Sequence, residues 1–237
     1  MIVTIDGPAG AGKSTVTRKL AQEIGFQYLD TGAMYRAVTW QAIQNGIDFN
    51  DEFALQQVAT NLILVFDADR VIIGGQDVSE AIRTPEITRQ VVKVADAVAV
   101  RSQLVDLQRR IASSGNFVCE GRDQGTVAFP DAFCKVFLTA SASSRAKRRS
   151  EQLLAAGHFV DFDQIVREQK TRDVQDQNRE IGRLQKASDA IEVNTDQLTI
   201  DEVVTKLARI VRERMACLLY TSPSPRDRTR SRMPSSA

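Results

Sequence analysis

The string Gly7-Pro8-Ala9-Gly10-Ala11-Gly12-Lys13-Ser14-Thr15 constrains this chain more than any other feature. It fits the pattern G-x-x-x-x-G-K-[ST], in which glycines let backbone N–H groups turn inward around phosphate oxygens. The apolar run at residues 2–5 predicts a buried strand before it, and residues 14–24 have helical spacing and end at Gly25. A glycine-rich turn followed by a chance Lys-Ser is the alternative, and the strand and helix favour a phosphate-binding loop.

The motif predicts that residues 7–15 bind ATP. The amine of Lys13 is expected to reach the β- and γ-phosphates, which makes it a predicted catalytic residue, and the Ser14 hydroxyl is expected to ligate Mg²⁺. The helix that follows adds its positive N-terminal dipole. GTP switches also carry this loop, but they need the strings Asn-Lys-x-Asp and Asp-x-x-Gly, and neither occurs in the sequence.

Composition bounds the class of protein. A chain of 237 residues is long enough for one α/β domain with a small insert. No apolar stretch approaches 18 residues, and the first residues have no basic segment or cleavage site, so we expect a cytoplasmic protein without a membrane partner. The three cysteines form no C-x-x-C pair, which fits a reducing compartment, and the single histidine, His158, excludes a histidine triad or a multi-histidine metal site.

Charge separates the last residues from the rest of the chain. Residues 218–237 carry four arginines and one aspartate, which leaves 27 basic and 29 acidic residues elsewhere. A slightly acidic body does not favour a nucleic-acid partner. Residues 217–237 are predicted to be a disordered tail that resembles translated cloning sequence. A native solvated tail and a basic nucleic-acid arm are the alternatives.

The spacing of hydrophobic residues along the chain predicts the remaining helices and strands. Residues 62–66, 70–73 and 76–79 are expected to form a small antiparallel sheet. Thr84 and Pro85 mark a helix start, as N-cap and first helical residue. Other strands are predicted at residues 27–29, 116–120, 135–139 and 190–194, and helices at 32–44, 51–61, 85–111, 143–156, 162–184 and 199–216. This alternation predicts an α/β fold of the P-loop NTPase type, a parallel sheet with helices on both faces and a small antiparallel insert.

Three further strings follow the phosphate loop. They are Asp30-Thr31-Gly32-Ala33-Met34-Tyr35-Arg36, then Glu120-Gly121-Arg122-Asp123-Gln124-Gly125-Thr126 with Phe129-Pro130-Asp131-Ala132, and Arg172-Asp173-x-x-Asp176-x-x-Arg179. Together they resemble the acceptor site of bacterial cytidylate kinases, in consistent order from about residue 2 to residue 215. The resemblance implies transfer of a phosphoryl group from ATP to CMP or dCMP, in pyrimidine metabolism, by a monomer whose partners are small nucleotides.

Arginines suit this chemistry. The acceptor phosphate is largely dianionic near pH 7, so the transfer needs no side-chain base and instead needs positive charge that holds phosphates in line. The planar fork of arginine does this best. Arg36, Arg122 and Arg179 are the candidates for the acceptor phosphate, and Arg122 and Arg179 are also predicted to be catalytic. A surface ion pair is the alternative for any one of them.

Base recognition is predicted from donors and acceptors. A carboxylate suits the N4 amine of cytosine, and Asp123 matches the family residue in that role. Arg101 is expected at the acceptor edge of the base. The resemblance also places Arg172 and Asp176 near the sugar and Thr31 in the substrate site. One position departs from the family, because Val92 stands where a serine is usual, and this predicts looser selectivity for cytosine.

The resemblance also divides the chain into parts. Residues 1–216 are expected to be the kinase, with an acceptor-binding insert at about 31–112 and a short lid at about 145–180. At least one of Arg145, Arg148 and Arg149 is expected to close over ATP, whereas a solvated charged face is the alternative. Trp40 is predicted to pack, and His158 is predicted to have no catalytic role. A kinase for UMP, AMP or shikimate, or an ATP-binding module without turnover, are the competing functions.

Overall fold

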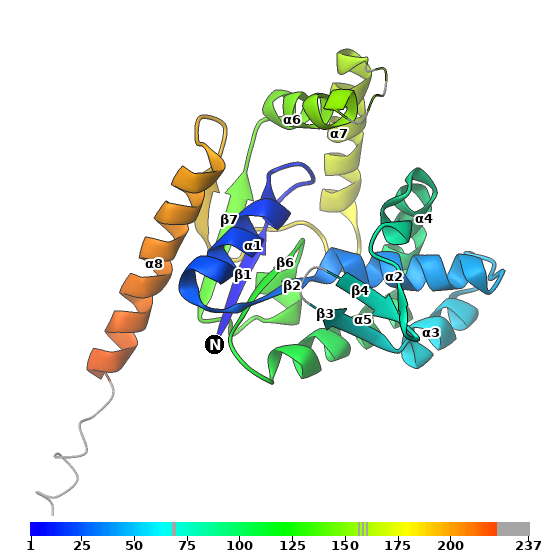
Figure 1. Cartoon of the computed structure of the whole chain (residues 1–237), viewed down its shortest axis with the longest axis horizontal. Coiled ribbons are helices and arrows are strands. Elements are labelled where there is room, and N and C mark those ends of the chain that lie inside the picture. The colour runs from blue at the N-terminus through cyan, green and yellow to red at the C-terminus, as the bar shows by residue number, and fades with distance from the viewer. Residues whose placement is uncertain (68–69, 156, 158, 160, 222–237) are drawn as a thin grey trace, which may run out of the picture.

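A five-stranded parallel sheet forms the centre of the protein, with strand order β2-β6-β1-β7-β8 (Figure 1). The structure is a computed structural model that describes residues 1–67, 70–155, 157, 159 and 161–221. The strands of this sheet are β1 (Ile2–Asp6), β2 (Gln27–Asp30), β6 (Phe117–Gly121), β7 (Cys134–Thr139) and β8 (Ile191–Asn194). The predicted α/β class is confirmed, and the central strand β1 leads directly into the phosphate loop.

Helices cover both faces of the sheet because side chains alternate along its strands. On one face, Val3 and Ile5 of β1 pack under α1 (Lys13–Ile24) and α8 (Ile200–Thr221). On the other face, Phe117 and Cys119 of β6 pack against α2, α3 and α5. The helices of that side are α2 (Thr31–Gln44), α3 (Glu52–Asn61), α4 (Pro85–Asp96) and α5 (Val98–Ala112). The two apolar clusters separate the interior into two layers, as a doubly covered parallel sheet requires.

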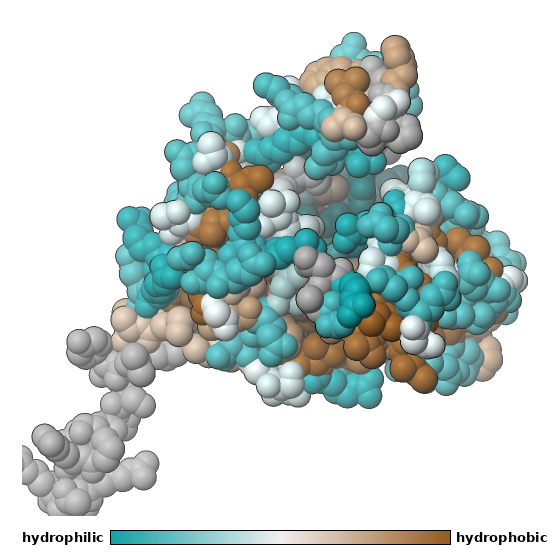
Figure 2. All heavy atoms as spheres, in the orientation of Figure 1, coloured by the Kyte–Doolittle hydropathy of each residue, from teal (hydrophilic) through white to brown (hydrophobic). Residues whose placement is uncertain are grey.

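The small antiparallel sheet is present, with order β3-β4-β5. Its strands are β3 (Leu64–Asp67), β4 (Arg70–Ile73) and β5 (Gln76–Asp77), and the short 3₁₀ turn η1 (Ala81–Arg83) follows them. Val71 and Ile73 pack against Ala33 and Ala37 of α2, and Trp40 packs against the same cluster, as predicted. The face shown in Figure 2 is mainly hydrophilic, with an apolar area near this sheet.

Two helices of the predicted lid region lie at the carboxyl end of the parallel strands (Figure 1). They are α6 (Ala142–Ala155) and α7 (Phe162–Asn178). The predicted end of α7 at residue 184 is wrong, because the helix stops at Asn178. Arg179 leaves the helical conformation with ψ of 139°, Gly182 has φ of +65°, and the N–H of Leu184 donates to the carbonyl of Asp176 at 2.7 Å.

The last helix is longer than predicted. Helix α8 runs to Thr221, five residues beyond the expected end at residue 216, so the first residues of the predicted tail are helical. Residues 222–237 and His158 lie outside the described residues, and the predictions on them stay predictions. Among the helices of the described ranges, none has the length and apolar character needed to cross a membrane.

Candidate active site

The phosphate loop follows β1 and holds Lys13 over its own backbone. Gly7 and Gly12 have φ of +150° and +87°, and a Cβ on Gly7 would overlap the carbonyl oxygen of Leu138 on β7, so glycine is required there. The Lys13 amine donates to the carbonyls of Gly7 and Pro8, both at 2.8 Å. Burial and then the charge of Arg122 lower the pKa of Lys13 to about 7. The loop therefore holds the Lys13 amine against its own backbone carbonyls, beside the position where it would hold a phosphate.

Ser14 lies beside a buried carboxylate that the sequence reasoning did not assign. Its hydroxyl donates to Oε2 of Glu120 at 3.0 Å, and the Tyr28 hydroxyl donates to Oε1 of the same carboxylate. Glu120 is buried at the end of β6, and burial followed by the charge of Asp30 raises its pKa. A hydroxyl and a carboxylate are the oxygen donors that Mg²⁺ prefers, and Mg²⁺ is usually held by few protein groups together with substrate phosphates. These two residues fit such a site.

The start of α2 brings Thr31 and Arg36 to the same end of the sheet. The Asp30 carboxylate caps this helix by accepting from the N–H of Ala33 at 2.8 Å, and it also pairs with Arg36 at 2.9 Å. The Thr31 hydroxyl donates to the backbone carbonyl of Glu120 at 2.6 Å. Arg36 and Thr31 are thus fixed next to the carboxyl end of β6, where the predicted acceptor residues continue.

Arg101 and Asp123, the two predicted base-reading residues, form a buried ion pair. Their side chains are only 6% and 7% exposed. The Arg101 guanidinium also donates to the carbonyl of Ala95 at 3.2 Å and lies over the ring of Tyr35, 5.6 Å from its centroid. The sequence named both residues without predicting that they pair with each other. A carboxylate and a guanidinium therefore stand side by side, both almost fully buried.

The remaining predicted arginines gather around Asp176. Nε of Arg122 lies 2.9 Å from Oδ2 of Asp176, and Nη1 of Arg179 lies 3.4 Å from Oδ1. Burial raises the pKa of Asp176, but Arg122, Arg179 and Arg172 outweigh it and the net shift is downward. Arg172 itself is exposed and has no hydrogen bond or ion pair to any described side chain or backbone group. It is the arginine of this group that is left open for an anion.

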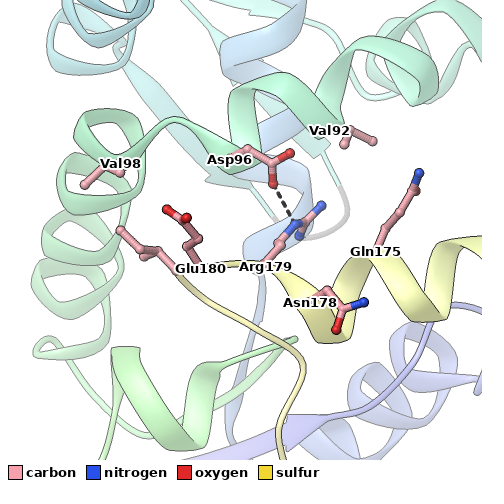
Figure 3. Close-up of a pocket in the computed structure, with 8 residues that line it drawn as sticks. Val92, Asp96, Val98, Gln175, Asn178, Arg179 and Glu180 are labelled. Carbon is pink, nitrogen blue, oxygen red and sulfur yellow. Dashed lines mark ion pairs between the residues drawn. The ribbon is translucent and has the colours of Figure 1, made fainter.

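A cleft of about 410 Å³ opens beside this cluster, between α4 and the end of α7 (Figure 3). Arg179 reaches across it to Asp96, with Nε 2.7 Å from Oδ1, and this ion pair was not predicted. Val92 lines the same cleft from α4. The position that departs from the family pattern therefore adds an apolar wall close to the acceptor arginines.

The three arginines of the lid region differ in their surroundings. Arg145 is 3% exposed and ties α6 to the phosphate loop and α7, through the carbonyl of Ala9 at 3.0 Å and a bidentate pair with Asp173. Arg148 donates to the carbonyl of Thr195 at 2.6 Å and more weakly to that of Ala11 at 3.4 Å. Arg149 is exposed. The first two face the ATP loop, and the third fits the alternative of a solvated face.

Sequence reasoning missed two carboxylates of this site, Asp6 and Glu120. Asp6 ends β1 just before the phosphate loop, and both of its oxygens accept backbone N–H groups of the π-helical turn η2 (Gln124–Ala128). Both residues carry the same signal, an acidic side chain at the carboxyl end of a buried parallel strand. That position is where α/β proteins place their ligands, so the signal was available in the sequence.

Comparisons with known proteins show the family of this chain. The family model described as cytidylate kinase matches residues 3–213. Cytidylate kinase of Rhodopirellula baltica is 50% identical over 213 residues, covering 90% of this chain and 93% of that protein. Cytidylate kinase of Carboxydothermus hydrogenoformans is 47% identical over 215 residues, covering 89% and 97%. A solved gluconokinase from Sinorhizobium meliloti aligns over 93% of this chain and 97% of its own, with 16% identity and a TM-score of 0.46. The chain belongs to the cytidylate kinase family.

Proposed function

We propose that this protein transfers the γ-phosphoryl group of ATP to CMP or dCMP, giving ADP and CDP or dCDP. The observation that carries the proposal is the buried Arg101–Asp123 pair, which lies at the same end of the sheet as the phosphate loop and the arginines around Asp176. A base-reading pair next to two sets of phosphate-binding groups fits a nucleotide acceptor, and it has no use in a kinase for a small sugar or acid.

The residues divide the work of the transfer. Residues 7–15 hold the phosphates of ATP through backbone N–H groups, and Lys13 leaves its own loop carbonyls to bind the β- and γ-phosphates. Arg122 and Arg179, with Arg36, hold the acceptor phosphate and the transferring group in line, because negative charge gathers there during the transfer. The acceptor phosphate attacks without a side-chain base, since it is already largely dianionic near pH 7.

Magnesium fits the oxygen donors beside the loop. When bound, Mg²⁺ supplies positive charge between the phosphates of ATP. The Ser14 hydroxyl would hold it, and Glu120 accepts the hydroxyl proton of Ser14, which leaves the oxygen lone pairs of the serine turned outward. Glu120 thereby orients the proposed metal ligand.

Selectivity for cytosine follows from donors and acceptors. The Asp123 carboxylate accepts from the N4 amine, and Arg101 donates to the acceptor edge of the base. Uracil has a carbonyl in place of the amine, so it would face Asp123 with two acceptors opposed, which costs on the order of 1–3 kcal/mol. Arg172, Asp176 and Thr31 are proposed to contact the sugar and its surroundings.

The division into parts and the setting of the enzyme are also proposals. Residues 31–112 are proposed to bind the acceptor and residues 145–180 to form the lid, supported by the lid arginines that contact Ala9 and Ala11. Buried thiols at Cys119 and Cys134 support a reducing compartment, the cytoplasm. We also propose a monomer, which sedimentation in solution tests directly.

The experiment is a coupled assay of ADP release with CMP, dCMP, UMP, AMP and shikimate as acceptors. We expect turnover with CMP or dCMP and a strong loss in Lys13→Ala, on the order of 100-fold in kcat. Lys19→Ala is the matched control, because Lys19 of α1 forms only an exposed ion pair with Asp201 of α8. This variant should keep full activity. No turnover with CMP or dCMP contradicts the proposal. Turnover with another acceptor supports a different kinase, and ATP binding without any turnover supports a non-catalytic module.

A further inference from the structure

The side chain of Asp6 joins the strand before the phosphate loop to the turn that carries the acceptor residues. It is 4% exposed, its Oδ1 accepts from the N–H of Gln124 at 2.9 Å, and its Oδ2 accepts from the N–H of Gly125 at 2.7 Å. Among the described residues, no other side chain of β1 forms a hydrogen bond to this turn. Asp6 is not one of the residues proposed to bind phosphate, because the phosphate loop begins at the next residue, Gly7.

The backbone of Asp6 is held rigidly. In the central strand β1, Asp6 pairs with Gly121 of β6 on one side and with Phe137 of β7 on the other. A strand fixed from both sides gives the carboxylate a constant position relative to Gly7 and the phosphate loop. Asp6 can therefore serve as a fixed point against which η2 is held.

The two accepted N–H groups are the first ones of η2. A helical turn leaves its first N–H groups without partners inside the turn, and here a carboxylate from a distant strand satisfies both. In return, η2 closes on itself through the N–H of Val127, which donates to the carbonyl of Asp123 at 2.8 Å. Asp123, the residue just before η2, is thus connected to Asp6 indirectly, through the backbone hydrogen bonds of η2.

Gly125 packs closely against its neighbours at this point, with little room for a side chain. A Cβ there would lie 3.3 Å from Oδ2 of Asp6, 3.0 Å from the hydroxyl of Thr4 and 3.2 Å from Cδ of Lys135. The contact is built into the packing of two strands, β1 and β7, against one turn. It is not an incidental hydrogen bond of a loose loop.

We propose that Asp6 is a positioning residue for the acceptor site. By holding the start of η2, it sets the distance of Asp123 and Arg122 from the phosphate loop and so aligns the acceptor nucleotide with ATP. Burial raises the pKa of Asp6 to about 6, against the lowering effect of the two N–H donors, so the carboxylate is ionised at neutral pH and both oxygens accept. The inference rests on the proposed function, because it takes Asp123 and Arg122 as acceptor-binding residues.

The first test is Asp6→Asn, measured as a split between the two substrates. The amide keeps one acceptor oxygen and turns an NH₂ group toward the second backbone N–H, so η2 loses one bond and gains a repulsion. We expect KM for CMP to rise on the order of tenfold and KM for ATP to stay within about twofold, since the loop is held by β1 itself. Equal changes for both substrates, or an unchanged KM for CMP, would overturn the proposal.

Two control variants separate positioning from lost stability. Asp51→Asn makes the same substitution at a carboxylate that caps α3 by accepting from the N–H of Ala54 at 2.9 Å. Val211→Ala removes a buried side chain of α8, remote from the site. We expect both to lower stability and to leave both KM values unchanged. If Val211→Ala raises KM for CMP as Asp6→Asn does, the effect comes from stability and the proposal fails.

A double variant tests whether Asp6 acts through Asp123. The loss of CMP affinity on Asp6→Asn, measured by calorimetry, should be smaller in an Asp123→Asn background than in the wild type. Additive losses would contradict action through Asp123.

A measurement without substrate tests the contact itself. Hydrogen exchange of the Gln124 and Gly125 amides should speed up on the order of tenfold in Asp6→Asn, and unchanged protection would overturn the proposal. If the wild type shows no CMP turnover, the proposed function fails, and the exchange result still decides the role of Asp6 in holding η2.

Discussion

Arg101 of α5 and Asp123, in the short segment between β6 and η2, form a buried ion pair. In their proposed role each offers the other the group that a cytosine base would use, so on that proposal a bound nucleotide shares or replaces this pair. Because both side chains are almost fully buried, the pair depends on the surrounding protein and not on solvent.

Removing Asp123 should damage acceptor binding more than ATP binding. In Asp123→Ala, the N4 amine loses its carboxylate, and we expect KM for CMP to rise roughly 10- to 100-fold with little change in KM for ATP. The free energy of unfolding should fall by about 3 kcal/mol, because Arg101 is left buried without its partner. Asp106→Ala is the control, since Asp106 pairs only loosely with Arg109 at 4.0 Å on the exposed face of α5. An equal loss for CMP and ATP would contradict the role of Asp123.

Arg172 should contribute to binding and not to stability. It forms no hydrogen bond or ion pair in the described part of the chain, and its attraction to Asp176 is opposed by repulsion from the neighbouring arginines. Arg172→Ala should therefore raise KM for CMP about tenfold and change the free energy of unfolding by less than about 0.5 kcal/mol. Asp176→Ala is the contrasting variant, because it frees the charges of Arg122 and Arg179 and should lower stability as well. Urea denaturation and steady-state kinetics measure both quantities. A stability loss in Arg172→Ala equal to that in Asp176→Ala would show a structural role.

Arg145 and Arg149, four residues apart on α6, should behave differently. Arg145→Ala breaks the contacts to Ala9 and Asp173, so we expect KM for ATP to rise about tenfold and the free energy of unfolding to fall by about 3 kcal/mol. Arg149→Ala should leave both within error, because the side chain is exposed. A matched effect of the two variants would favour a general effect of lid charge over the specific contacts of Arg145.

The ionisation of Asp6 should appear in the pH dependence of stability. Burial gives it a folded-state pKa of about 6, above the ordinary value of 3.8, so the folded protein binds the extra proton. This favourable contribution is fully present below pH 4 and is lost as pH rises through 6. Relative to Asp6→Asn, the wild type should therefore lose about 1 kcal/mol of stability between pH 5 and pH 7.5. Urea titrations of both proteins at the two pH values measure the difference, and a constant difference would show that Asp6 does not titrate in this range.

Local sequence signals correctly predicted the helix ends that depend on residues only a few positions away along the chain. Thr84 caps α4 by accepting from the N–H of Ile87 at 3.4 Å, and Gly25 ends α1 with φ of +70°, both as expected from residue type. The end of α7 was wrong because tertiary contacts decide it, the ion pair of Arg179 with Asp96 and the left-handed turn at Gly182. Helical period alone continues through these residues.

The sequence predicted which residues belong to the candidate site, but it did not predict which of them form ion pairs with one another. Motif strings named Arg101, Asp123 and Asp176, but which carboxylate meets which arginine depends on how α4, α5 and α7 pack, and no local pattern records that. The position of Asp6 at the end of a buried strand was readable from the sequence, but its partners were not, because they belong to η2, a π-helical turn 118 residues away with no periodic signature.

The ion pairs around the proposed acceptor site also affect how fast a nucleotide associates with it. Arg36 is matched by Asp30 and Arg101 by Asp123. Arg122 is matched by Asp176, and Arg179 by Asp96. Such pairs cancel at distances beyond a few ångströms, so the pocket projects a weak field into solution. Attraction across the solvent therefore adds little to the encounter, and the association rate of the acceptor should vary only weakly with ionic strength. Binding then depends on short-range contacts, in which the arginines exchange their aspartate partners for groups of the nucleotide.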